Sequence, residues 1–182
     1  MPEIRLSFRS YVPPGGLVKS VHKLLSIIRP DRIRAIEAVI LTDSDSIGRG
    51  RTQRVRGRKY DRRDCRGFYH PAGQHNTAWI EIVVDNVLAG VPPLAQAIPL
   101  VRELLLADTV YHEVGHHLQQ TYGAAAGEGV AEKWARRTGQ RFLRKHYRWL
   151  FVLTWPIVMV YRLTTSWSEV VRHRYKKRPT RF

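Results

Sequence analysis

His112, Glu113 and His116 lie within the segment YHEVGHH at 111–117. Two histidines four residues apart share one face of a helix, with Cβ atoms about 5–6 Å apart, so both imidazoles can bind one metal ion. Glu113 follows the first histidine and would lie beside that ion, where a base is needed. With 8 histidines in 182 residues, this motif arises by chance with an expectation of only about 0.015. The segment therefore predicts a metal site, the alternative being an ordinary helix with hydrogen-bonded histidines.

The surrounding sequence predicts helices that would position these residues. Apolar residues recur at spacings of three to five across 100–110, Pro99 suits a first turn, and Gly123 suits a helix end. Either one long helix or two helices joined near 107–108 would carry the motif. A second helix is predicted to start near Gly127 and to include EGVAEKWARR.

Residues 99–137 resemble a known enzyme class. HEVGH resembles the zinc-binding helix of the zincin metallopeptidases, and GEGVAEKWA is similar to the glutamate helix of their gluzincin branch. The resemblance implies that His112 and His116 bind zinc, that Glu113 is the general base and that Glu128 is the third ligand. Glu132, one turn later, would either hold a ligand histidine or take the place of Glu128.

The metzincin branch does not fit the residues. Its longer motif needs a glycine at position 119 and a histidine at position 122, whereas this chain has Gln119 and Tyr122.

The resemblance also implies an activity, that of a zinc-dependent endopeptidase with one zinc ion per chain. Zinc would lower the pKa of a water molecule toward about 7, and Glu113 would take its proton during peptide hydrolysis. Tyr122, His117 and His146 are candidates for stabilising the oxyanion, although ordinary packing explains each equally simply. In zincins an edge strand above the cleft binds the substrate, and the counterpart expected here is 78–84, with a plain core strand as the alternative.

The remaining segments predict an α+β fold with a small mixed sheet. A helix is expected within 16–30 and a buried strand over 36–41. Residues 67–70 and 78–84 are expected to form a hairpin or two neighbouring strands. The predicted organisation is a zincin-like catalytic domain over 1–147, followed by an apolar segment and a basic tail over 148–182.

The chain is strongly basic, with a net charge of +16 and a pI near 10.8. Residues 43–66 hold eight arginines and one lysine and predict an exposed loop or loose hairpin, either simply solvated or anion-binding. Cys65 is the only cysteine, which excludes an internal disulfide and a cysteine-rich zinc site. No apolar run suited to secretion occurs near Met1, so a cytoplasmic location is expected.

Residues 149–161, WLFVLTWPIVMVY, form the most apolar run of the chain. Thirteen helical residues cover about 20 Å, less than the ~30 Å hydrocarbon core of a bilayer, and Pro156 interrupts them. A buried core helix or an interfacial anchor is therefore expected rather than a full span. The basic residues at 172–181 would favour peripheral binding to anionic lipid.

Three functions remain open from the sequence. The first is a zinc peptidase that acts on a protein or peptide substrate. The second is a nucleic-acid-binding protein with a structural metal, suggested by the basic segment 43–66. The third is a protein of the membrane surface with an inactive metal motif, suggested by 149–161.

Overall fold

The computed structural model describes residues 1–48, 52–55, 58–74, 76–123 and 127–150. Its main sheet has four strands in the order β1-β2-β6-β5. β1, β2 and β6 are parallel, and β5 runs antiparallel to β6. Their bounds are Glu3–Ser7 for β1, Ile36–Thr42 for β2, Gly67–His70 for β5 and Ala78–Val83 for β6. The described part of the chain is thus α+β with a small mixed sheet, as expected, although β1 was not predicted.

The order of the strands decides between the two expectations for 78–84, in favour of the core strand. β6 lies between β2 and β5 and is therefore an interior strand. It cannot add a substrate strand, because both of its edges are already paired. The strands at the edges of the sheet are β1 and β5, and β5 is joined to β6 in a hairpin that starts with the pair Gly67 and Ile82.

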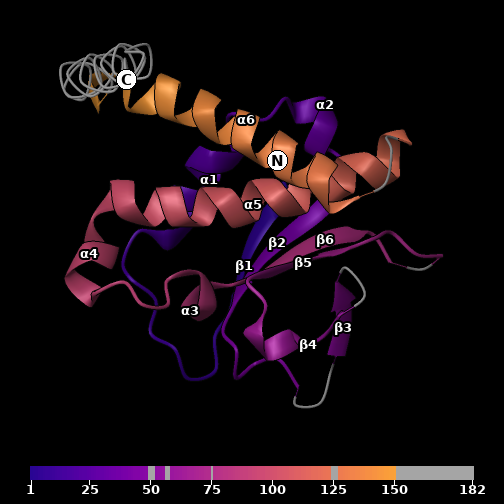
Figure 1. The fold of residues 1–182 in the computed structure, drawn as a ribbon, viewed down its shortest axis with the longest axis horizontal. Helices are drawn as coiled ribbons and strands as arrows, with labels where there is room; N and C mark the ends of the chain where they lie inside the picture. The colour runs from indigo at the N-terminus through magenta and orange to yellow at the C-terminus, as the bar shows by residue number, and fades with distance from the viewer. Residues whose placement is uncertain (49–51, 56–57, 75, 124–126, 151–182) are drawn as a thin grey trace, which may run out of the picture. The chain divides into compact units, whose positions relative to one another are not determined.

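Helix α5 is a single helix that runs from Pro99 to Tyr122 and carries the HEVGH motif. It ends at Gly123, whose φ of 62° belongs to the left-handed region that favours glycine. Helix α6 (Glu128–His146) follows it, and α5 lies between α6 and the sheet (Figure 1). The other helices are α1 (Leu17–Leu25), α2 (Pro30–Ile33), α3 (Val84–Val87) and α4 (Pro93–Ala97).

Polar contacts attach α5 to α1. Tyr111 is fully buried, and its hydroxyl donates to the Leu24 carbonyl at 3.0 Å. The Lys23 ammonium lies 2.7 Å from the Glu103 carboxylate, which is itself buried. Apolar residues of α1, β2, β6 and α5 fill the core around these contacts: Val21, Leu24, Val39, Leu41, Ile80, Ile82, Leu106, Val110 and Val114. The metal-motif helix is therefore fixed to α1 and to the core of the unit.

Most of the arginine-rich segment 43–66 lies within the described residues. It forms an antiparallel hairpin, β3 (Thr52–Val55) and β4 (Arg58–Asp61), followed by the 3-10 helix η1 (Arg62–Asp64). The prediction of a hairpin is confirmed, but two residues near the start of the segment are buried rather than exposed. Asp43 is only 1% exposed and Ile47 is buried against Phe68 and Val83.

The chain divides into two compact units, Met1–Phe142 and Leu143–Phe182. Among the residues that the structure describes, no helix has the length and apolar character needed to cross a membrane. Apart from Trp149 and Leu150, the apolar run 149–161 and the basic tail lie outside the described residues. The expectations for them stay predictions.

Candidate metal centre

Two faces of α5 contribute to the candidate site. Thr109, Glu113 and His117 follow one another at intervals of four and face β5, because Thr109 and Glu113 contact Gly67 and His117 contacts Tyr69. The other face carries His112, Gly115 and His116. It is turned toward α6, since Gly115 is packed against α6. The HEVGH segment therefore lies against β5 on one face of α5 and against α6 on the other.

Gly115 allows α6 to approach closely. A Cβ atom at this position would lie 2.9 Å from the Ala131 Cα and 3.1 Å from its carbonyl oxygen. Such distances are shorter than normal contacts, so only glycine permits this packing. Glu128 precedes Ala131 by three residues, about one helical turn, which brings its side chain over the two histidines.

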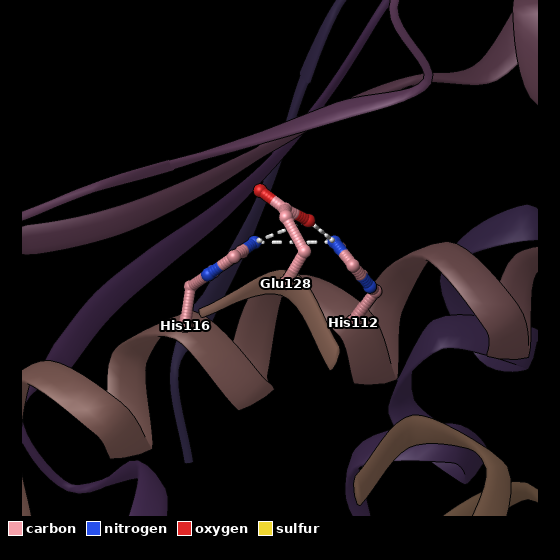
Figure 2. A group of neighbouring side chains, drawn as sticks. All are labelled: His112, His116 and Glu128. Atoms are coloured by element: carbon pink, nitrogen blue, oxygen red, sulfur yellow. Dashed lines mark hydrogen bonds and ion pairs between the residues drawn. The ribbon is translucent and has the colours of Figure 1, made fainter. Parts of the chain in front are cut away.

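His112, His116 and Glu128 bring three ligand atoms within 4.8 Å of one another (Figure 2). The His112 Nε2 atom lies 3.1 Å from His116 Nε2 and 3.2 Å from Glu128 Oε2. His116 Nε2 lies 3.7 Å from the same carboxylate oxygen. Donor atoms placed tetrahedrally at zinc bond lengths of about 2.0–2.1 Å are about 3.3 Å apart. The three separations are close to this value, and the donor set of two imidazoles and one carboxylate suits zinc.

The protonation of His116 also suits metal binding. Burial, followed by the nearby His112, lowers the pKa of His116, while Glu128 opposes that change. The imidazole is therefore mainly neutral at pH 7, and the neutral ring is the form that binds a metal.

Glu132 lies elsewhere. It is exposed, and its carboxylate pairs with Arg136 at 3.5 Å on the same helix. The structure therefore brings Glu128, and not Glu132, to the two histidines.

Glu113 is a buried carboxylate beside this trio, with an exposed fraction of 7%. Burial, with the nearby Glu128 charge as a second cause, raises the pKa of Glu113 to about 8. The backbone N–H of Tyr69 donates to it and acts in the opposite direction. A Cβ atom on Gly67 would lie 3.1 Å from the Glu113 Cγ and 2.8 Å from the Thr109 Cγ2. Glycine at position 67 thus leaves the room in which Glu113 lies under the edge strand.

A pocket of about 540 Å³ opens over these groups. One wall is formed by the edge strand β5 and by the flanking residues Cys65 and Pro71. The other wall is formed by α5 and the start of α6. The lining residues are Cys65, Gly67, Tyr69, Pro71, His112, Glu113, His116, Gln119, Gln120 and Glu128. The three ligand atoms and the buried carboxylate therefore share one space that is open to solvent and large enough for part of a peptide.

The three candidates for stabilising an oxyanion are not among the residues that line this pocket. Tyr122 is 59% exposed, and its hydroxyl points to the Asp31 carbonyl at 3.4 Å. His117 is buried, and its Nδ1 is hydrogen-bonded to the Tyr69 hydroxyl at 3.1 Å. His146 belongs to the second compact unit. None of them is assigned a catalytic role here.

Two arginines of the basic segment are engaged within the protein. The Arg62 guanidinium stacks over the Phe68 ring at 4.1 Å and lies 3.6 Å from the Glu81 carboxylate. Arg63 pairs with Asp45 at 2.5 Å. These two side chains are thus committed to holding η1 in place, and anion binding by the rest of the segment stays a prediction.

The sequence did not predict that residues of β5 and its flanks, above all Gly67 and Tyr69, line the site. Their role depends on contacts with α5 that link distant parts of the chain, for which the sequence holds no local signal. Gly67 is the one weak indication, since a glycine within a strand often marks the close approach of another element.

No family model, no curated protein and no solved structure matches the chain. The geometry of this site is therefore what indicates a function.

Proposed function

We propose that the chain is a zinc-dependent peptidase whose zinc ligands are His112, His116 and Glu128. The observation that carries the proposal is the convergence of these three ligand atoms, from two helices, beside a buried carboxylate. Zinc bound there would act as a Lewis acid, polarising a peptide carbonyl and lowering the pKa of a water molecule.

In this proposal Glu113 is the general base. Its carboxylate lines the same pocket as the ligand atoms, where it can reach a water molecule bound beside them. It accepts a proton from the attacking water and passes it to the leaving amine. The Tyr69 N–H holds the carboxylate in place during this transfer.

The substrate backbone would pair with the edge of β5. The Val83 N–H donates to the Arg66 carbonyl, so residues 66, 68 and 70 are those that bond to β6. The backbone groups of Gly67 and Tyr69 therefore point away from β6, and both residues line the pocket. The Tyr69 N–H already donates to Glu113, so a substrate strand would use the Gly67 backbone and the Tyr69 carbonyl. An extended peptide can add to such an edge as a further strand, which gives β5 the role first expected of β6.

The test measures zinc in protein purified without chelators or affinity metals. We expect about one zinc per chain in the wild type and none in His116→Ala or Glu128→Gln. Glu132→Gln is the matched control for Glu128→Gln and should keep its zinc, because its carboxylate lies away from the histidines. Absence of zinc from the wild type, even after zinc is supplied, would refute the metal site.

A second variant separates metal binding from catalysis. Glu113→Gln should keep its zinc and lose cleavage of an unfolded protein substrate by about 10²–10⁴-fold, the usual contribution of a general base. Turnover at the wild-type rate in this variant would show that Glu113 is not the base.

A further inference from the structure

Gln119 lies where the two ligand-bearing helices meet. It follows His116 by three residues on α5, is half-buried, and lines the site pocket. Its other side borders an apolar pocket of about 310 Å³ that also includes Gly115 and Val130. Gln119 therefore lies between the candidate metal centre and the contact between α5 and α6.

One end of the Gln119 amide holds the start of α6. Its Nε2 donates to the Gly127 carbonyl at 2.8 Å. The same carbonyl accepts from the Val130 N–H at 3.1 Å, within the first turn of α6. Because Gly127 directly precedes Glu128, this pair of bonds fixes the peptide from which the third ligand projects.

The other end of the amide is within reach of His116, which lies one turn earlier on the same helix. His116 Nε2 faces His112 and Glu128, so Nδ1 is the nitrogen on the outer side of the trio. His116 and Gln119 are three residues apart on α5 and both line the site pocket, so their side chains are neighbours. The Gln119 Nε2 is already committed to Gly127, which leaves the amide oxygen to accept a proton from Nδ1. That bond would fix the tautomer in which Nε2 is free to bind a metal.

We propose that Gln119 is a positioning residue that joins the two ligand-bearing helices, with its amide oxygen on the His116 ring and its amide nitrogen on the peptide before Glu128. Groups that hydrogen-bond the ligands of a metal orient them, and their loss typically weakens metal affinity by 10–100-fold. This inference rests on the proposed function, because it presumes that the trio binds zinc.

The experiment compares zinc dissociation constants, measured by chelator competition on the full chain, with absorption spectra of the cobalt-substituted proteins. Gln119→Met has a similar length and removes both hydrogen bonds. Gln119→Glu keeps an acceptor for His116 but cannot donate to Gly127. Gln140→Met is the matched control, because Gln140 is exposed on α6 and lies away from the trio.

We expect the zinc dissociation constant of Gln119→Met to rise about 10–100-fold, with altered cobalt bands that report a changed ligand geometry. Gln119→Glu should lie between this variant and the wild type, and Gln140→Met should match the wild type. Wild-type affinity in Gln119→Met would overturn the inference, and wild-type affinity in Gln119→Glu would overturn the contribution of Gly127. Failure of the proposed function is distinguishable, since the wild type and the control would then also lack zinc.

Discussion

Asp43 and Glu113 are two buried carboxylates of the same compact unit with opposite hydrogen-bonding environments. One oxygen of Asp43 accepts from the backbone N–H groups of Arg9, Ser10 and Tyr11 at 2.7–2.9 Å. The other accepts from the Ser46 N–H and hydroxyl. Burial alone would raise the pKa of Asp43, but these donors hold it well below its usual range.

Fewer hydrogen-bond donors offset the burial of Glu113. Its carboxylate gains one donor from the Tyr69 backbone, faces a second carboxylate in Glu128, and has a pKa raised to about 8. Hydrogen-bond donors outweigh burial at Asp43, whereas burial outweighs the single donor at Glu113. Asp43 ties residues 9–11 to the end of β2, whereas Glu113 keeps a raised pKa, which accords with its proposed role as a base. Carboxyl groups with raised pKa values are concentrated at functional sites, because burial with few donors is what raises them.

The largest effect is expected at Asp43. Asp43→Asn replaces a charged acceptor of several hydrogen bonds and should lower the free energy of unfolding by about 3 kcal/mol, measured with urea at pH 7. Asp64→Asn, at an exposed position of η1, is the matched control and should change stability by less than about 0.5 kcal/mol. A small effect at Asp43 would remove the contrast with Glu113.

The effect of Asp43→Asn on stability should also depend on pH. The folded pKa of Asp43 is lowered, so its contribution is fully present above the unfolded value of about 3.9 and is lost as the pH falls toward the folded value. The stability gap between wild type and Asp43→Asn should therefore be constant above about pH 5 and narrow progressively in acid. A gap that widens in acid would contradict the assigned direction.

At the candidate metal centre, the position of Glu128 depends on how closely α6 packs against α5. Gly115→Ala would introduce a Cβ atom 2.9 Å from the Ala131 Cα, so α6 must move away. We expect a loss of about 2 kcal/mol in the free energy of unfolding, together with weaker zinc binding as Glu128 shifts. Gly139→Ala is the control: it is also helical but has nothing within 4 Å of its Cβ position. That variant should gain about 0.5–1 kcal/mol, and an equal loss in both would show that the contact with Ala131 is unimportant.

These two regions also show how far the sequence could be read. The spacing of His112, Glu113 and His116 is local, so it predicted the helix face that the structure displays. The short strands 36–41, 67–70 and 78–84 were likewise predicted from apolar and β-branched runs. The choice between Glu128 and Glu132 remained open because it depends on the distance between two helices, which Gly115 and Ala131 determine.

The errors concern relationships across the chain. β6 was expected at an edge, but the order of strands depends on crossovers that a pattern of residues does not encode. The DSDS segment at 43–46 resembled a surface loop, since its composition is polar. The burial of Asp43 follows only from residues 9–11, whose N–H groups reach it from a distant part of the chain. Hydrogen bonds of this kind become visible only once β1 is paired with β2.

The smallest expected effect is at Glu113, where a substitution should raise the free energy of unfolding rather than lower it. In metal-free protein at pH 7, its burial beside Glu128 disfavours the ionised form, whereas the unfolded carboxylate is solvated. Glu113→Gln removes this cost, keeps an oxygen that can accept from the Tyr69 N–H, and should raise the free energy of unfolding by about 1 kcal/mol. Urea denaturation with a chelator present measures this gain, and the exposed Glu132→Gln should show none. A stability loss in Glu113→Gln would mean that Glu113, like Asp43, is a structural carboxylate, and the contrast between the two sites would fail.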